Sequence, residues 1–285
     1  MSGERSLAEA AERLQAMANG FQAARILSLG VEVGIFDALA QGGRGAEEVA
    51  AEPGLDARGT EIVLDDLVAL ELLEKANGRY DNGPAAAAFL VRGVPQSMAH
   101  IAGHRAEMFR SWARLDRILH EGPSVKEEQK ATLTDPETNR NFIRGMAEVS
   151  RGRLGPILDR LPLAEARRFV DLGGGPAQYC CEAVRRHDDL EAILVDLPLT
   201  VEVAKECIAE AGLEGRVQTV VCDFFNAPAL PLEADVDVLL ISQVLHAEGP
   251  EQNAALLTKA AAVLRPGGVL AVVENLVEED RSRPA

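Results

Sequence analysis

The chain has 285 residues and is 47% hydrophobic, so it is long enough to bury the cores of two domains. It carries 29 basic and 45 acidic residues, which gives a formal net charge of −16. A surface of that sign repels a phosphate backbone, so we expect no nucleic-acid partner. The chain starts without a signal-peptide pattern and has no apolar run near the ~20 residues of a membrane span. The sequence therefore predicts a cytoplasmic protein with no membrane partner.

The cysteines show neither metal-site spacing nor a disulfide framework, because no CxxC pair occurs and two of them are adjacent. We expect all four to be reduced, buried and apolar in character: Cys180, Cys181, Cys207 and Cys222. No metal site is predicted.

Residues 1–105 form the first predicted domain. Apolar residues recur at helical spacing between Leu14 and Val33, and Asn77-Gly78 is a strong hairpin signal after two further helical stretches. Helices followed by a small hairpin indicate a winged-helix-like unit. The apolar stripe exceeds what such a unit can cover, which favours a homodimer, although burial of the stripe within its own chain is almost as compatible with the sequence.

Residues 106–163 read as a helical connector with a polar loop from Gly122 to Thr134. Residues 164–285 form the second predicted domain, in which short apolar runs alternate with helical segments. That alternation is the pattern of βαβ units and a parallel sheet. The five expected strands are Arg168–Leu172, Ala192–Asp196, Val217–Val221, Val236–Ile241 and Val269–Val277.

A glycine-rich turn follows the first of these strands, in Asp171-Leu-Gly-Gly-Gly-Pro. Glycine there allows a sharp turn and the close approach of a ligand. Asp196 ends the second strand at the separation that one βαβ unit gives, and can accept hydrogen bonds from both hydroxyls of a ribose. Asp223-Phe224-Phe225 follows the third strand, where a carboxylate and an aromatic ring suit an adenine.

Two cofactors compete for this pattern. NAD would require a glycine where Gln178 stands in the fingerprint Gly173-x-Gly175-x-x-Gln178. A cationic sulfonium also suits a pocket rich in carboxylates better than a pyrophosphate does. The sequence therefore favours S-adenosylmethionine.

At this point a set of motifs resembles the O-methyltransferase family that includes plant caffeate and acetylserotonin O-methyltransferases and bacterial enzymes that decorate polyketides and other aromatic natural products. The motifs are Asp171-Leu-Gly-Gly-Gly-Pro, Val195-Asp-Leu-Pro, Cys222-Asp-Phe-Phe, Val244-Leu-His and Leu264-Arg-Pro-Gly-Gly, with Leu29-Gly-Val-Glu-Val-Gly-Ile-Phe-Asp-Ala-Leu and Leu67-Val-Ala-Leu-Glu-Leu-Leu-Glu in the N-terminal half. The resemblance covers nearly the whole chain. It implies an α/β, Rossmann-like class I methyltransferase domain behind an N-terminal helical, winged-helix dimerisation domain.

The resemblance also implies site residues. His246 matches the family's general base after the fourth strand, and Glu274 matches the carboxylate on the fifth strand that orients it. A histidine so held can take a proton from a phenol. The cofactor would be bound by Asp171, Gly173, Gly175, Asp196, Leu197, Asp223, Phe224 and Ser242. The aromatic acceptor would be lined by Trp112, Phe142 and Met146, although their spacing also fits core packing.

The sequence departs from the family pattern in several places. Ala177 replaces the loop's last glycine, and Ser242 stands where a lysine often contacts the cofactor. Ala247-Glu248-Gly249-Pro250 replaces the aromatic and acidic residues that usually follow the histidine. The sequence also closes soon after the fifth strand, where family members continue with a helix and two antiparallel strands, so we expect those C-terminal strands to be missing.

Four hypotheses follow. The leading one is methyl transfer from S-adenosylmethionine to a hydroxyl of an aromatic, polyketide-type small molecule. The others are a non-catalytic S-adenosylmethionine-binding scaffold, a family member repurposed for hydroxylation or decarboxylation of a similar substrate, and a winged-helix DNA binder, which the acidic charge opposes.

Overall fold

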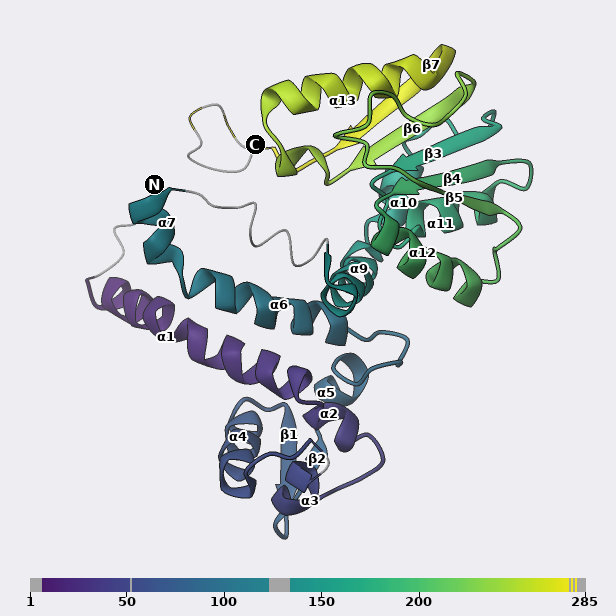
Figure 1. Cartoon of the computed structure of the whole chain (residues 1–285). Coiled ribbons are helices and arrows are strands. Elements are labelled where there is room, and N and C mark those ends of the chain that lie inside the picture. Colours follow the sequence, from purple (N-terminus) through teal and green to yellow (C-terminus); the bar gives the residue numbers. More distant parts are fainter. Residues whose placement is uncertain (1–6, 52, 123–133, 277, 279, 281–285) are drawn as a thin grey trace. The chain divides into compact units, whose positions relative to one another are not determined.

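A computed structural model describes residues 7–51, 53–122 and 134–276, together with Glu278 and Asp280 (Figure 1). The chain divides into two compact units, Met1–Glu128 and Gln129–Ala285. This division falls inside the stretch 106–163 that we interpreted as a connector. Most of the predicted polar loop between Gly122 and Thr134 lies outside the described residues.

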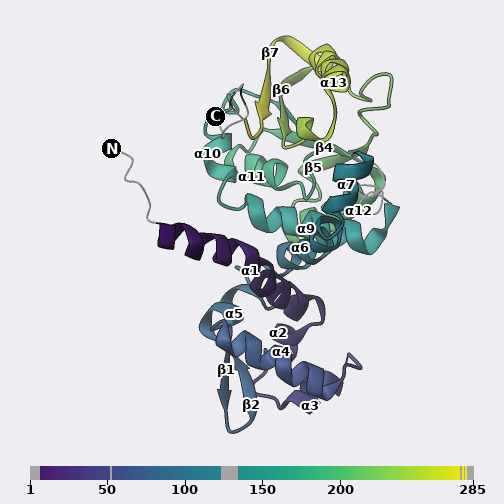
Figure 2. The ribbon, with the colours of Figure 1, turned by 90° about the vertical axis from the view of Figure 1, so that its left-hand side faces the viewer.

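The first unit combines helices with one small hairpin. Its elements are α1 (Leu7–Glu32), α2 (Ile35–Ala38), α3 (Ala46–Ala51), α4 (Ala57–Ala69), β1 (Leu73–Ala76), β2 (Arg79–Asn82), α5 (Pro84–Phe89), α6 (Ala99–Trp112) and α7 (Leu115–Glu121). The chain starts α4 at Asp56, whose Oδ1 accepts a hydrogen bond of 2.7 Å from the Gly59 N–H. The predicted hairpin is confirmed, because β1 and β2 form an antiparallel pair (Figure 2). Asn77 and Gly78 both have positive φ at the turn between these strands.

Helix α1 exposes much of its apolar stripe. The side chains of Ile35, Phe36, Leu64 and Leu67 are buried in the core of this unit. In contrast, Leu14, Met17 and Phe21 on α1 are 66%, 69% and 56% exposed. The first half of the stripe is therefore left uncovered by the part of the chain that the structure describes.

The second unit is a parallel sheet in the order β5-β4-β3-β6-β7. Its strands are β3 (Arg168–Leu172), β4 (Glu191–Asp196), β5 (Val217–Val221), β6 (Val236–Ser242) and β7 (Leu264–Val273). The remaining elements are α9 (Pro136–Ser150), α10 (Leu154–Leu158), α11 (Gln178–Arg186), α12 (Pro198–Glu210), the 3₁₀ turn η1 (Leu245–Ala247) and α13 (Pro250–Val263). The strand order reverses beside β3, at the point where open α/β sheets bind ligands.

Helices cover both faces of this sheet, because alternate residues of each strand point to opposite sides. Phe169 and Leu194 face the core formed with α11 and α12, whereas Val170 and Val195 face the core formed with α13. Figure 1 shows α13 on the opposite face of the sheet from α11 and α12. The predicted Rossmann-like architecture is thus present in the described residues.

The fifth strand differs from the expected Val269–Val277. It begins at Leu264, because Leu264 pairs with Val236 across a register shift, and it ends at Val273. Glu274 therefore directly follows the strand and does not lie within it. The segment Pro266-Gly267-Gly268 is part of the first half of the strand.

Two absences among the described residues bear on the predictions. No helix in these ranges is long and apolar enough to cross a membrane. Across the same ranges, no group of three or more histidine, cysteine or acidic side chains is arranged to hold a metal ion. The four cysteines are free thiols, three buried and Cys207 half-buried, and burial raises the pKa of each.

Candidate functional site

The predicted cofactor loop runs from the end of β3 to the start of α11. Gly173, Gly175 and Ala177 all have positive φ, and Ala177 is the only one of the three with a side chain. A Cβ on Gly173 would lie 2.6 Å from Val244, whereas a Cβ on Gly175 would meet only Ile143, at 3.9 Å. The loop is therefore packed on one side and open at Gly175.

Gly174, between those two glycines, was missed by the sequence analysis. A Cβ at this position would stand 2.1 Å from Asp171 Oδ2 and 2.7 Å from Leu194 Cδ1. No side chain fits there without moving the carboxylate. In a run of three glycines, nothing in the sequence shows which one makes room for the acid.

Asp171 is a fully buried carboxylate at the carboxyl end of β3. Neither of its oxygens has a hydrogen-bond partner among the described residues. Burial raises the pKa of Asp171 to about 8, and the neighbouring Asp196 adds to the rise. A buried acid without a partner is costly, so this group is suited to a ligand that brings a hydrogen-bond donor or a positive charge.

Asp196 ends β4, the neighbouring strand, in register with the cofactor loop. Its Oδ2 accepts a hydrogen bond of 2.9 Å from the Gly175 N–H, and its Oδ1 accepts one of 2.7 Å from the Leu197 N–H. Burial raises the pKa of Asp196 to about 6, although these two hydrogen bonds oppose the rise. Each oxygen keeps a further acceptor site, so the carboxylate can hold the loop and bind a hydroxyl as well.

The turn after β5 carries the other two predicted cofactor residues. Phe224 is buried, and its ring edge lies 3.4 Å from the position of a Cβ on Gly173. Asp223 is exposed and accepts hydrogen bonds of 3.2 and 2.8 Å from the backbone and side chain of Asn226. Lys259 of α13 fixes this turn, because its Nζ donates to the carbonyls of Phe224 and Phe225, at 2.6 and 3.0 Å, and to a third carbonyl beyond them.

His246 lies in η1, just beyond the end of β6, and faces Glu274 beyond the end of β7. His246 Nδ1 is 3.1 Å from Glu274 Oε2, while Glu274 Oε1 accepts a hydrogen bond of 2.7 Å from the Leu245 N–H. The histidine side chain is 63% exposed and the glutamate 11%. Burial raises the pKa of Glu274, but the hydrogen bonds from His246 and Leu245 outweigh it and leave that pKa below its ordinary value.

The turn that carries His246 is held by side chains absent from the predicted set. Gln243 has a positive φ, and its N–H donates a 2.8 Å hydrogen bond to the Val273 carbonyl at the end of β7. Asn275 donates to Gln243 Oε1 at 3.0 Å, and Asn253 of α13 donates to two carbonyls of the turn. These contacts join residues of three different elements, so sequence spacing alone could not reveal them.

Ser242 ends β6 and is half-buried beside Tyr179, the second residue of α11. Burial raises the pKa of Tyr179, and its hydrogen bond with Ser242 opposes this rise. The predicted cofactor residue is thus part of the same strand-end edge as Asp171. Tyr179 was not in the predicted set.

The three predicted acceptor residues belong to different units. Trp112 is the last residue of α6 in the first unit and is 68% exposed. Phe142 and Met146 are half-buried on α9 in the second unit, on either side of Ile143, which approaches the cofactor loop at Gly175. Helix α9 is held against α12 by a two-pronged ion pair at 2.7 Å between Arg144 and Glu210.

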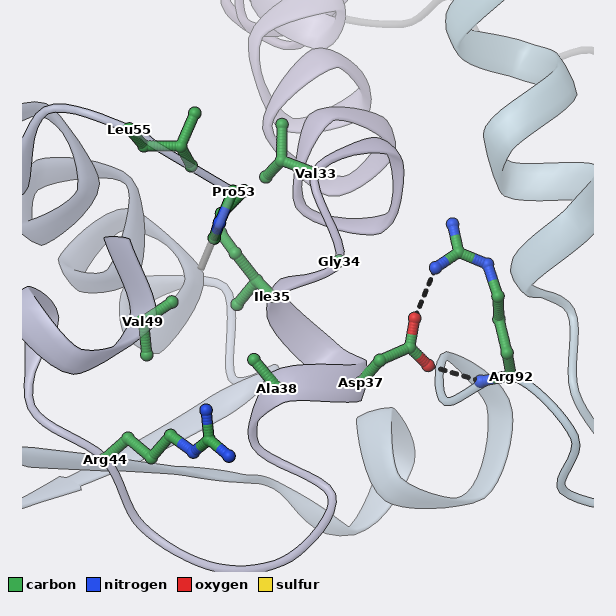
Figure 3. Close-up of a pocket in the computed structure, with 10 residues that line it drawn as sticks. All are labelled: Val33, Gly34, Ile35, Asp37, Ala38, Arg44, Val49, Pro53, Leu55 and Arg92. Atoms are coloured by element: carbon green, nitrogen blue, oxygen red, sulfur yellow. Dashed lines mark hydrogen bonds and ion pairs between the residues drawn. The ribbon is translucent and has the colours of Figure 1, made fainter. Parts of the chain in front are cut away.

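Two cavities elsewhere share no residue with the predicted site. One, of about 460 Å³, lies in the first unit between apolar side chains such as Val33 and Ile35, beside the ion pair of Asp37 with Arg92 (Figure 3). The other lies at the amino edge of the sheet, around Arg168 and Asp237. Arg92 in the first cavity and Arg168 and Arg265 in the second already pair with acidic side chains of the same cavity, so neither cavity replaces the carboxyl edge as the candidate site.

Comparisons with known proteins identify the family of the chain. Residues 122–285 match the model of the O-methyltransferase domain, and residues 15–92 match that of the O-methyltransferase dimerisation domain. The chain belongs to the O-methyltransferase family. The resemblance inferred from the motifs is thereby confirmed, as is the order of a helical dimerisation domain and a Rossmann-like domain.

Three relatives illustrate the family. The chain is 32% identical to 3-hydroxy-5-methyl-1-naphthoate 3-O-methyltransferase of Streptomyces sahachiroi, over 94% of this chain and 78% of that protein. It is 31% identical to the N,N-dimethyltransferase OxyT of Streptomyces rimosus, over 95% and 80%. The structure of human N-acetylserotonin methyltransferase in complex with SAM matches 100% of this chain and 84% of that one, with 27% identity and a TM-score of 0.81.

Proposed function

We propose that this O-methyltransferase binds S-adenosylmethionine at the carboxyl edge of its sheet. The proposed contacts are Asp171, Gly173, Gly175, Asp196, Leu197, Asp223, Phe224 and Ser242. The unpartnered buried carboxylate of Asp171 fits a cationic ligand, and the open side of the loop at Gly175 leaves room for its backbone to be approached. Its human relative was solved with this cofactor.

The proposed reaction is methyl transfer to a hydroxyl of an aromatic small molecule. Bound S-adenosylmethionine supplies an electrophilic methyl group. The chain's part is to hold the acceptor and to remove its proton as the methyl–oxygen bond forms. Because Nδ1 of His246 faces Glu274, we assign the neutral imidazole its proton on Nδ1, which leaves Nε2 free to accept the acceptor's proton.

The contact between His246 Nδ1 and Glu274 Oε2 is the observation that carries this proposal. The carboxylate, whose pKa is lowered in the folded protein, stabilises the imidazolium that forms when Nε2 takes the proton. A scaffold that only binds the cofactor would not need this arrangement. The same base could deprotonate an amine, and the relation to OxyT makes an amine the second candidate acceptor.

We propose an acceptor with a flat, apolar body that lies against Phe142 and Met146 of α9. The lining role of Trp112, in the first unit, stays a prediction from the sequence. The naphthoate in the name of the Streptomyces sahachiroi relative is an acceptor of this kind. We also propose that the chain acts as a homodimer through its first unit, which matches the family's dimerisation domain.

The test is a double-mutant cycle on methyl transfer to a panel of phenols. His246→Ala should lower kcat by ~10²–10⁴ with little change in cofactor affinity. Glu274→Gln keeps the acceptor for Leu245 but turns an amide N–H toward Nδ1, which forces the proton onto Nε2 and removes the base. The double variant should therefore be little slower than His246→Ala alone.

The matched control is His187→Ala, which removes the other histidine of the second unit, at the end of α11. It should leave kcat unchanged. Fully additive losses in the cycle would show that His246 and Glu274 act independently. Calorimetric binding of S-adenosylmethionine without transfer to any acceptor would favour the non-catalytic scaffold.

A further inference from the structure

The turn that carries His246 is held by side chains from other elements. On the amino side, the N–H of Leu245 donates to Glu274 Oε1 at 2.7 Å. The carbonyl of the same residue, which belongs to the peptide bond leading into His246, accepts a hydrogen bond of 2.8 Å from Asn253 Nδ2. The two peptide planes that precede His246 are therefore both fixed in orientation.

Asn253 also reaches beyond the turn. Its Nδ2 donates a second hydrogen bond, of 3.2 Å, to the carbonyl of Glu248, which follows η1. One primary amide thus spans the 3₁₀ turn from the residue before His246 to the second residue after it. The orientation of the amide is unambiguous, because the reverse would place Oδ1 against two carbonyl oxygens.

These hydrogen bonds do not serve the start of α13. A helix cap accepts from the free N–H groups of the first turn, whereas the Asn253 amide donates to carbonyls that precede the helix. The helix begins at Pro250, and its N-cap residue Gly249 provides no side-chain cap. Ala247 and Gly249 have no polar side chain that could hold the turn, so its carbonyls of Leu245 and Glu248 are held by Asn253 and its Leu245 N–H by Glu274.

We propose that Asn253 is a positioning residue for His246, an inference that rests on the proposed function. It fixes the peptide planes so that Nδ1 meets Glu274 and Nε2 points away from that carboxylate. Only a side chain with two donors on one nitrogen can hold both carbonyls at these distances. A carboxylate of the same size would repel both, and a methyl group would release them.

The experiment compares Asn253→Asp and Asn253→Ala with wild type, and Gln252→Ala serves as control. Gln252 is the exposed neighbour in the same helical turn. We expect kcat to fall about 10-fold to 100-fold, as for a misplaced catalytic group, with the acceptor KM and the S-adenosylmethionine Kd within about twofold of wild type. The control should retain wild-type kcat.

A second readout does not require catalysis. With ¹⁵N-labelled histidine, the ring signals of His246, assigned through His246→Gln, should report the Nδ1–H tautomer in wild type and a mixture of tautomers in both Asn253 variants. Circular dichroism shows whether each variant is folded. If Asn253→Asp is unfolded, the test rests on Asn253→Ala. A folded Asn253→Ala protein with wild-type ring signals and kcat overturns the proposal. An inactive wild type in which the tautomer still depends on Asn253 overturns the proposed function instead.

Discussion

At the scale of single residues, the edge of the sheet holds two buried carboxylates with pKa values of about 8 for Asp171 and about 6 for Asp196. A cationic ligand binds the ionised form of Asp171 more tightly than the neutral form. The affinity for S-adenosylmethionine should therefore rise several-fold between pH 6 and 8, and binding near pH 7 should release protons. Calorimetry in buffers of different ionisation enthalpy measures both effects, and an affinity that stays constant over this range would contradict the role of Asp171.

The same pKa shift makes the stability of the ligand-free protein depend on pH. Because the pKa of Asp171 is higher in the folded state than in the unfolded state, the folded state loses stability as pH rises toward about 8. Asp171→Asn should flatten this dependence between pH 6 and 8 and should weaken cofactor binding. The exposed Asp189→Asn is the control and should change neither property.

The sequence could predict the residues whose roles depend on strand ends. Asp171 and Asp196 lie at the carboxyl ends of recognisable strands one βαβ unit apart, and His246 and Glu274 were found through the family motifs. The structure brings both pairs together. It could not predict Gly174, Asn253 or Lys259. Their partners are a neighbouring side chain or carbonyl groups of other elements, and such contacts are set by packing rather than by local pattern.

At the scale of elements, the loop between β3 and α11 depends on the smallness of Gly174. An added Cβ would lie 2.1 Å from Asp171 Oδ2, and Gly174 has no positive φ that would itself resist alanine. Gly174→Ala should therefore destabilise the protein by about 1–3 kcal/mol through overpacking, and should lower cofactor affinity by moving the carboxylate. Urea unfolding and calorimetry measure the two effects.

Gly215→Ala provides the matched control, because a Cβ there would meet no atom within 4 Å and its φ is also not positive. The free energy of unfolding of the Gly215→Ala variant should stay within about 0.5 kcal/mol of that of wild type. If Gly174→Ala proved equally neutral, the loop would be able to shift without cost, and Gly174 would not be required for the position of Asp171.

The elements themselves could largely be read from the sequence, because near-continuous apolar runs and an Asn-Gly turn are strong local signals. The first four strands of the second unit lie where expected, within one residue. The fifth begins at Leu264 instead of the predicted Val269, in a stretch where Pro266, Gly267 and Gly268 locally disfavour a strand. Pairing of Leu264 with Val236 extends the strand through them, and tertiary pairing overrides the local preference.

At the scale of the whole molecule, the prediction is association of two copies through the first unit. Leu14, Met17 and Phe21 on α1 are each more than half exposed, and residues 15–92 match the dimerisation domain. Apolar side chains at this density favour burial against a second copy. Each copy has a net charge of −16, so long-range repulsion opposes that association.

The double variant Met17→Glu and Phe21→Glu should convert the dimer into a folded monomer, which sedimentation velocity at micromolar concentration detects. Ile62→Glu on α4, where the side chain is 50% exposed, is the control and should leave the dimer intact.

Higher ionic strength shortens the Debye length from ~10 Å at 0.1 M to ~3 Å at 1 M, so salt should strengthen an apolar contact between two acidic chains. A folded wild-type monomer at micromolar concentration, or dissociation on adding salt, would show that α1 does not provide the interface.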